Sequence, residues 1–274
     1  MQNQNSLVSL IWQAATFALL FSCLVLAILF WTAPAIAQSL APAPYKLSIY
    51  HNASERGVIS PGCATIIELS GGQFTGEAMH TLQNPPPFDL AGVTVTIDGN
   101  QAPIRMVSPA KLAIIAPDVK FPERMQRLGW FKVVVMTPVD TFTGWAAYAP
   151  TAPGLYEQTT GKTRHVQGLY QASAQLILPI TGEPIPAGVR VVLFGSGMRD
   201  AKQLRVWIDD GFDLWIVPAT LAVDAPPQGG VAGWAGFSWI EGIAFDLPKE
   251  AKGRVVMVVQ ADHMWSQEVW LTVF

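Results

Sequence analysis

Apolar and polar residues alternate in short runs along most of the chain after residue 44. Runs such as 93–97 and 204–208 place an apolar residue at every second position, which is the period of a half-buried β-strand. Clusters of Gly, Pro, Asn and Asp separate the runs, as turns between strands require. Helical periodicity is nearly lacking in this part of the chain. The pattern therefore predicts an all-β protein.

The same order of predicted strands and turns occurs twice along the chain. The stretch 59–72 reads ISPGCATIIELSGG and the stretch 185–197 reads IPAGVRVVLFGSG, and an Asp-Gly pair follows each, at 98–99 and 210–211. Asp-Gly between alternating runs predicts a tight hairpin, because Gly readily adopts positive φ. The strands expected in the first half are 64–69, 93–97, 104–107, 112–115, 131–136 and 144–149, and those in the second half are 189–194, 204–208, 214–217, 243–247, 254–259 and 269–274.

This doubling predicts two tandem immunoglobulin-like β-sandwiches. Each half offers strands with turn signals every ~8 to 12 residues over roughly 100 residues, which is the size and spacing of that class. We expect the first sandwich at 45–150, a Gly, Thr and Gln-rich linker at 151–175, and the second sandwich at 176–274. Such folds host many unrelated functions, so the fold alone implies no activity.

The residues before the sandwiches form an uncharged, apolar leader. Residues 1–38 contain no Asp, Glu, Lys or Arg, and the run 14–31 is almost wholly apolar. At ~1.5 Å per residue such a run is long enough to cross a bilayer, which predicts a membrane anchor within 7–31. Pro34 and the small residues before Gln38 instead predict a signal peptide cleaved after Ala37. Either alternative predicts an extracytoplasmic address (periplasmic, cell surface or secreted), with 39–44 as a Pro-rich spacer.

Several motifs resemble one family of exported proteins. They are Asn-Ala-Ser at 52–54, ISPG at 59–62, LAGVTVTIDGNQAPIRMVSP at 90–109, APGLY at 152–156 and PAGVRVVLFGSGM at 186–198. Together they resemble the Solibacter-type C-terminal domain family of acidobacterial exported proteins, over about residues 45–274. The two halves are also similar to immunoglobulin-like domains of the IPT/TIG type. The resemblance implies export and a β-sandwich fold, and it carries no catalytic residues.

The net charge and the reactive residues argue against several classes of function. The net charge is −3 and the basic residues are scattered singly, which argues against a nucleic-acid partner. The four histidines lie far apart in sequence, so no zinc site and no other metal or cofactor is expected. Cys63 is the only cysteine after the leader and is expected to be a small buried hydrophobe. Ser196 lies in FGSG, which lacks the spacing of a nucleophile elbow, and we expect no enzyme.

Tryptophans supply the candidate binding residues. Trp207, Trp215 and Trp270 lie out of phase with the aliphatic residues of their strands, as does Arg205. A three-residue loop at 210–212 would place Trp207 directly opposite Trp215. These residues either form an exposed aromatic platform or pack in the core or an interdomain seam. The sequence thus predicts a non-enzymatic, exported or membrane-anchored module for protein interaction or adhesion, either at the cell surface or as an accessory structural subunit of a membrane complex. The alternative is an extracytoplasmic carbohydrate-binding protein that uses exposed tryptophans.

Overall fold

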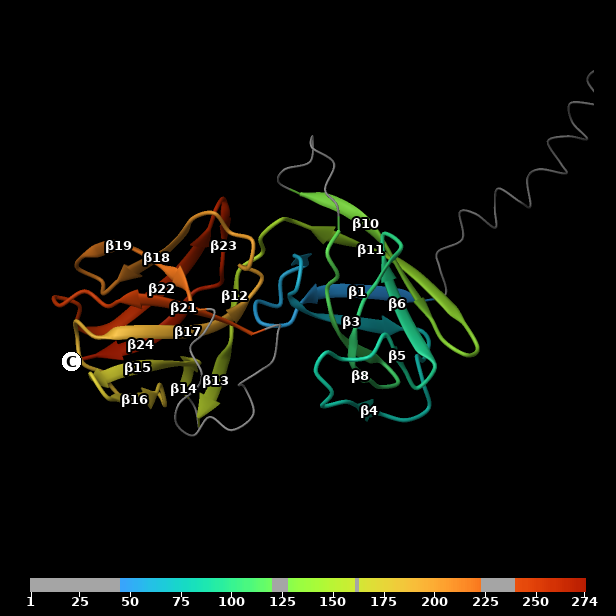
Figure 1. Cartoon of the computed structure of the whole chain (residues 1–274), viewed down its shortest axis with the longest axis horizontal. Helices are drawn as coiled ribbons and strands as arrows, with labels where there is room; N and C mark the ends of the chain where they lie inside the picture. Colours follow the sequence, from blue (N-terminus) through green and yellow to red (C-terminus); the bar gives the residue numbers. More distant parts are fainter. Residues whose placement is uncertain (1–44, 120–127, 161–162, 223–239) are drawn as a thin grey trace, which may run out of the picture. The chain divides into compact units, whose positions relative to one another are not determined.

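The strands form where apolar side chains alternate, and they do so throughout the described residues. The computed structural model describes residues 45–119, 128–160, 163–222 and 240–274 (Figure 1). In β6 (Val93–Ile97) the three aliphatic side chains are fully buried and the two threonines between them are half-buried. Strands and loops, without a helix, make up all of these residues. The predicted all-β class of tandem sandwiches is confirmed.

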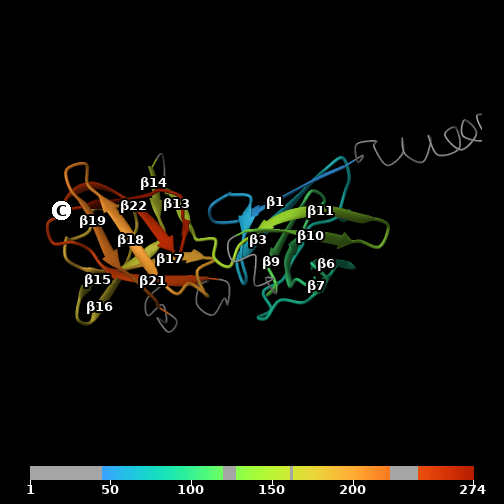
Figure 2. The same cartoon turned by 90° about the horizontal axis from the view of Figure 1, so that it is seen from above.

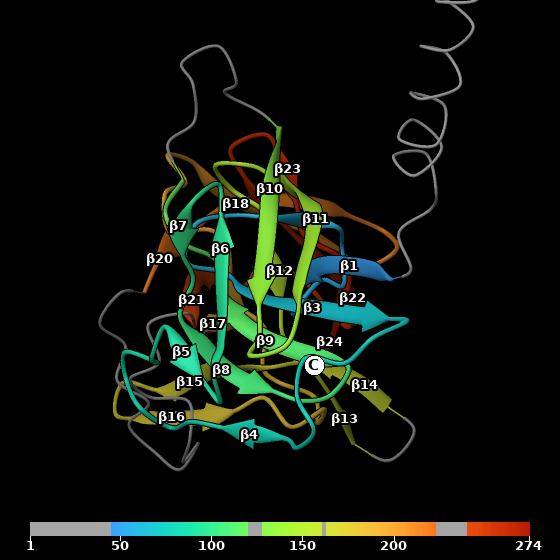
Figure 3. The ribbon, with the colours of Figure 1, turned by 90° about the vertical axis from the view of Figure 1, so that its right-hand side faces the viewer.

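The first sandwich consists of two antiparallel sheets, except that β2 joins its sheet in parallel. One sheet has the order β1-β3-β9-β8-β4, with β1 (Lys46–His51), β3 (Ala64–Ser70), β9 (Lys111–Ile115), β8 (Ile104–Val107) and β4 (Met79–His80). The other has the order β2-β11-β10-β6-β5 with β7 beside β6, and comprises β2 (Val58–Ile59), β11 (Thr141–Tyr148), β10 (Gly129–Met136), β6, β5 (Asp89–Leu90) and β7 (Asn100–Gln101) (Figure 3).

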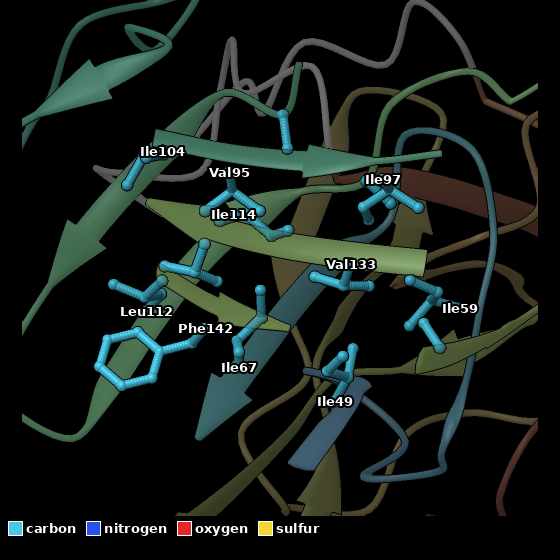
Figure 4. Packing of buried hydrophobic residues seen from close by; sticks show 14 of the residues in the cluster. Ile49, Ile59, Ile67, Val95, Ile97, Ile104, Leu112, Ile114, Val133 and Phe142 are labelled. Atoms are coloured by element: carbon cyan, nitrogen blue, oxygen red, sulfur yellow. The ribbon is translucent and has the colours of Figure 1, made fainter. Parts of the chain in front are cut away.

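Aliphatic side chains from both sheets fill the core of the first sandwich. Ile67 and Leu112 from one sheet and Val95 and Val133 from the other are all fully buried in one cluster (Figure 4). Burying such a side chain stabilises the fold by roughly 1.5 to 3 kcal/mol, so this layer supplies the main driving force for folding. Cys63 belongs to the same cluster, as its sequence context predicted.

The second sandwich also has two sheets (Figure 2). The first has the order β16-β15-β17-β21-β20 with β12 beside β17, and comprises β16 (Leu176–Pro179), β15 (Gly168–Ser173), β17 (Arg190–Ser196), β21 (Glu241–Asp246), β20 (Thr220–Leu221) and β12 (Gly154–Leu155). The second has the order β19-β18-β22-β23 with β24 beside β22, and comprises β19 (Leu214–Pro218), β18 (Leu204–Asp209), β22 (Gly253–Ala261), β23 (Met264–Trp265) and β24 (Val269–Val273).

The stretch 151–175, expected to be a linker, carries strands instead. It contains β12, the hairpin of β13 (Glu157–Thr160) with β14 (Thr163–Val166), and most of β15. The second sandwich therefore begins some twenty residues earlier than the expected residue 176. The reason is that Leu155 and Val166 are buried in the second core, although each stands next to polar residues in the sequence, so no apolar run marks a strand there.

The expected leader and spacer, residues 1–44, lie outside the described residues. Among the residues that the structure does describe, none belongs to a helix long and apolar enough to cross a membrane. Residues 45–274 form one compact unit by their contacts, so both sandwiches belong to it.

Candidate functional site

The register of the β18–β19 hairpin corrects the predicted pairing of the tryptophans. Trp207 lies opposite Ile216, and Trp215 lies opposite Ile208. The loop has four residues, 210–213, rather than the expected three, and this one-residue shift sends the two indoles to opposite faces of the sheet. Trp215 packs against the core of the second sandwich, whereas Trp207 lies on the outer face.

Three of the four predicted residues share that outer face. Arg205 and Trp207 on β18 alternate with buried neighbours, and Trp270 on β24 does the same. We call the surface to which they belong the β18 face. Its members are the outward residues of β18, β19, β22, β23 and β24, namely Arg205, Trp207, Asp209, Leu214, Ile216, Pro218, Arg254, Val256, Val258, Gln260, Trp265, Trp270 and Thr272.

The β18 face has an apolar centre that is open to solvent. Leu214 is 58% and Ile216 48% exposed on β19, and Trp265 is 40% exposed on β23 at the other end of the strand order. Trp207, Val256 and Val258 lie half-buried on the two strands between them. So much exposed apolar surface on one face of a sheet is unusual. The ring centroids of Trp207 and Trp265 lie 5.1 Å apart, a separation typical of favourable aromatic pairs. The indole N–H of Trp207 donates to Oε1 of Gln260 at 3.1 Å, which fixes the ring on the face.

Polar side chains border this centre. Arg205 and Asp209 are exposed on β18 on either side of Trp207. At the β24 side, the guanidinium of Arg254 lies 3.8 Å from the ring centroid of Trp270, a cation–π contact. An apolar centre with a polar rim is the usual anatomy of a protein–protein contact surface.

The first sandwich presents two tryptophans that the sequence analysis missed. Trp130 on β10 is 66% exposed and Trp145 on β11 is 63% exposed. In β10 every second residue is buried, so Trp130 and Lys132 point outward while Phe131 and Val133 point into the core. Trp130 is out of phase with the apolar residues of its strand, just as Trp207 is, so the same alternation signal marks it in the sequence.

A buried Ser–His contact joins the two sandwiches. His51 at the end of β1 is fully buried, and its Nε2 lies 3.0 Å from Oγ of Ser196 at the end of β17. Nδ1 of His51 accepts hydrogen bonds from the backbone N–H groups of Ala53 and Ser54, at 3.1 and 3.2 Å. Because Nδ1 is an acceptor, the proton of the neutral ring is on Nε2, and His51 donates to Ser196.

That direction of donation is the reverse of what nucleophilic catalysis needs. A catalytic histidine accepts the serine proton at Nε2, whereas Nε2 of His51 already carries a proton. Burial lowers the pKa of His51 to about 4, which keeps the ring neutral at physiological pH. Ser196 is fully buried as well, so no substrate reaches it in this arrangement. The Ser–His contact is structural.

A second buried polar group lies beside this contact. Glu241, at the start of β21, is 8% exposed, and its Oε2 accepts from the backbone N–H of Met198 at 2.6 Å. Burial raises the pKa of Glu241 to about 7, although that hydrogen bond and Arg199 favour the charged form. Nε of Arg199 is 3.9 Å from Oε1 of Glu241. This carboxyl therefore titrates near neutral pH.

Two further kinds of reactive group are a thiol and clusters of metal-ligating side chains. Burial raises the pKa of the Cys63 thiol to about 11, so it is not a reactive thiolate. Within 45–119, 128–160, 163–222 and 240–274, no three His, Cys, Asp or Glu side chains gather in a way that could hold a metal ion.

Comparison with known proteins gives structural likenesses only. No protein-family model matches the chain, and no curated protein matches it. Among solved structures, the chain is similar to domains 5–6 of the S-layer protein SbsC, at 10% identity and a TM-score of 0.23, with 84% of this chain and 96% of that one covered. It is also similar to the Escherichia coli adhesin FdeC, at 10% identity and a TM-score of 0.23, with 84% of this chain and 64% of that one covered. Domains 4–9 of SbsC give 12% identity and a TM-score of 0.22, with 84% and 31% covered. The strand order described above, and not these likenesses, defines the fold.

Proposed function

We propose that this chain is a non-enzymatic, extracytoplasmic interaction module that binds a protein partner through the β18 face. The observation that carries the proposal is the exposure of Leu214 and Ile216 on β19 and of Trp265 on β23, all on the same face of one sheet, with Trp207 on β18 in contact with Trp265. Water contact with such a group of side chains is unfavourable by roughly 25 cal/mol for each Å² of apolar area. A partner that covers them recovers that free energy.

The composition of the β18 face favours a protein over a polyanion or a metal. Its centre is aliphatic and aromatic, and its border carries both a cation, Arg205, and an anion, Asp209. Tryptophan and arginine are the residues most enriched among binding hot spots. Charges of both signs at the rim give a partner orientation more than affinity.

We propose no catalytic role for the Ser–His contact because of the direction of its hydrogen bond. His51 donates to Ser196 and is held in that tautomer by two backbone N–H groups, so it cannot act as the general base. The extracytoplasmic address and the accessory role beside a membrane complex rest on the uncharged apolar leader of residues 1–38. The motifs that resemble the Solibacter-type exported family support the same address.

The proposal is tested by placing a charge within the apolar part of the β18 face. Ile216→Asp puts a carboxylate directly opposite Trp207, where a docked partner would have to desolvate it. We expect the amount of partner that co-purifies with the variant from native membranes to fall at least about ten-fold. Such a fall corresponds to ~1.4 kcal/mol of binding free energy. A photo-crosslinking residue at 216 should form an adduct of defined mass.

Val139→Asp is the matched control. Val139 is 82% exposed in the turn between β10 and β11 of the first sandwich, so the same apolar-to-acid change is made on another surface. Partner recovery with this variant should equal that of the wild type. Equal recovery with Ile216→Asp, at unchanged thermal stability, would show that the β18 face is not the recognition surface.

A further inference from the structure

A cleft in the second sandwich lies next to one end of the β18 face. Its volume is about 610 Å³, within the range of sites for small ligands. Strand β24 forms one wall, and the β13–β14 hairpin lies against β24 (Figure 1). The loop 53–55 of the first sandwich completes the rim. Gln267 fixes this rim, since its Nε2 donates to the carbonyl of Ala53 at 3.1 Å.

Charged groups of both signs line the cleft. The carboxylates are those of Glu55, Glu157 and Glu268, and the guanidiniums are those of Arg164 and Arg254. Arg164 pairs with Glu157 at 3.0 Å. Within the described part of the chain, the other three form no ion pair, so their hydrogen-bonding capacity is available to a ligand.

The lining of the cleft includes a buried nitrogen without a hydrogen-bond partner among the described residues. This atom is Nδ1 of His165, a residue that is 4% exposed. Gly182, which also lines the cleft, lies against this ring, and a Cβ at that position would be 3.1 Å from Nδ1. A buried polar atom without a partner is costly, so a ligand hydroxyl that bonds Nδ1 would be favoured.

The mixture of positive and negative side chains favours an uncharged ligand over an ion. An ion of either sign would meet like charges in this space, whereas a hydroxyl group donates to a carboxylate and accepts from a guanidinium. A hydroxyl also suits either protonation state of an imidazole nitrogen. A ligand with many hydroxyls and no charge therefore uses every polar group of the lining.

We propose that this cleft binds a short neutral saccharide. The carboxylates of Glu157 and Glu268 accept from its hydroxyls, Arg254 donates to them, and His165 bonds one through Nδ1. Arg254 already covers one face of Trp270, so hydrogen bonds rather than stacking on that face hold the sugar. This site is separate from the centre of the β18 face and goes beyond the protein-binding function proposed above.

The test measures binding of defined sugars to the full chain in lipid nanodiscs. The probes are neutral di- to tetrasaccharides of the cello, malto, manno and chito series, followed by saturation-transfer NMR and then titration calorimetry. We expect at least one series to bind. Glu268→Gln and His165→Phe should each weaken that binding by about ten-fold or more, because each removes one hydrogen bond to the ligand.

Matched variants show whether the sugar occupies the cleft or another surface. Glu250→Gln makes the same change on an exposed turn away from the cleft, and Ile216→Asp disrupts the β18 face; both should bind sugar like the wild type. Glu268 is exposed, so its variant tests the cleft even if His165→Phe does not fold. Failure of every neutral series to bind, or equal affinity of Glu268→Gln and wild type, would overturn the proposal. Binding of charged sugars alone would overturn it too.

Discussion

Two buried titratable residues between the sandwiches respond to pH in opposite directions. His51 has its pKa lowered to about 4 by burial, so its contribution to stability is lost as pH falls below its unfolded value of 6.5. Glu241 has its pKa raised to about 7 by burial, so its contribution is present below 4.5 and is lost as pH rises toward 7. The two effects partly cancel in the wild type over this window.

Replacing Glu241 isolates the pH dependence of stability that this residue contributes. Glu241→Gln removes the group that must ionise while buried, and His51 is unchanged, so its titration cancels in the difference between the two proteins. We expect the variant to gain stability relative to wild type as pH rises from 4 to 8, by up to about 3 kcal/mol, since one pKa unit is worth ~1.36 kcal/mol. Urea denaturation at several pH values measures this difference. A difference that does not change with pH would contradict it.

At the scale of elements, the β18–β19 hairpin decides which tryptophan faces outward. Gly211 has a φ of +87° in its loop, and no atom lies within 4 Å of a Cβ built there. Gly211→Ala should therefore cost about 1 kcal/mol through backbone strain alone. Gly76 is equally open but does not have a φ in the left-handed region, so Gly76→Ala is the control and should be nearly neutral. Equal unfolding free energies for the two variants would exclude the strain.

Sequence reasoning succeeded where the signals within one short segment agreed. The expected strand 93–97 matches β6, because strict alternation and Asp98-Gly99 in its turn agree; both turn residues have positive φ. The pairing of Trp207 was predicted wrongly because Asp210-Gly211 suits loops of more than one length, and only the cross-strand register settles which one forms. Phase within β18 was still correct, since it depends on that strand alone.

The cleft and the buried contacts could not be predicted for a different reason. His51 and Ser196 are 145 positions apart, and nothing local in either segment marks the other as a partner. The β13–β14 hairpin that walls the cleft falls in the expected linker, where apolar residues are too sparse to signal strands. Sites of this kind arise only when distant segments converge.

At the scale of the molecule, the contacts between the sandwiches include specific polar contacts as well as an apolar cluster of Ala64, Ile115 and Ile240. Thr151 donates to the carbonyl of Ala261 at 3.2 Å, and Gln267 donates to the carbonyl of Ala53 at 3.1 Å. Buried polar contacts stabilise only while every partner stays in place. Residues of the first sandwich therefore influence the stability of the second, and the cleft beside loop 53–55 depends on this coupling.

Gly154 is the position at which this coupling can be broken. A Cβ there would lie 2.4 Å from Cε1 of His51 and 3.1 Å from the backbone nitrogen of Ser54, so Gly154→Ala forces His51 or the backbone around it to shift and disturbs the contact with Ser196. Overpacking of this kind typically costs about 1 to 3 kcal/mol. We expect the wild type to unfold in one calorimetric transition, and Gly154→Ala to unfold in two, the first at lower temperature.

Gly57→Ala is the matched change within the first sandwich. Its nearest neighbour would be the carbonyl oxygen of Ile49 at 4.0 Å, which is ordinary contact, so this variant should keep a single transition near the wild-type temperature. If Gly154→Ala also unfolds once at the wild-type temperature, the sandwiches do not depend on the His51 contact. Sugar binding would then be expected to survive the substitution as well, since loop 53–55 would remain in place.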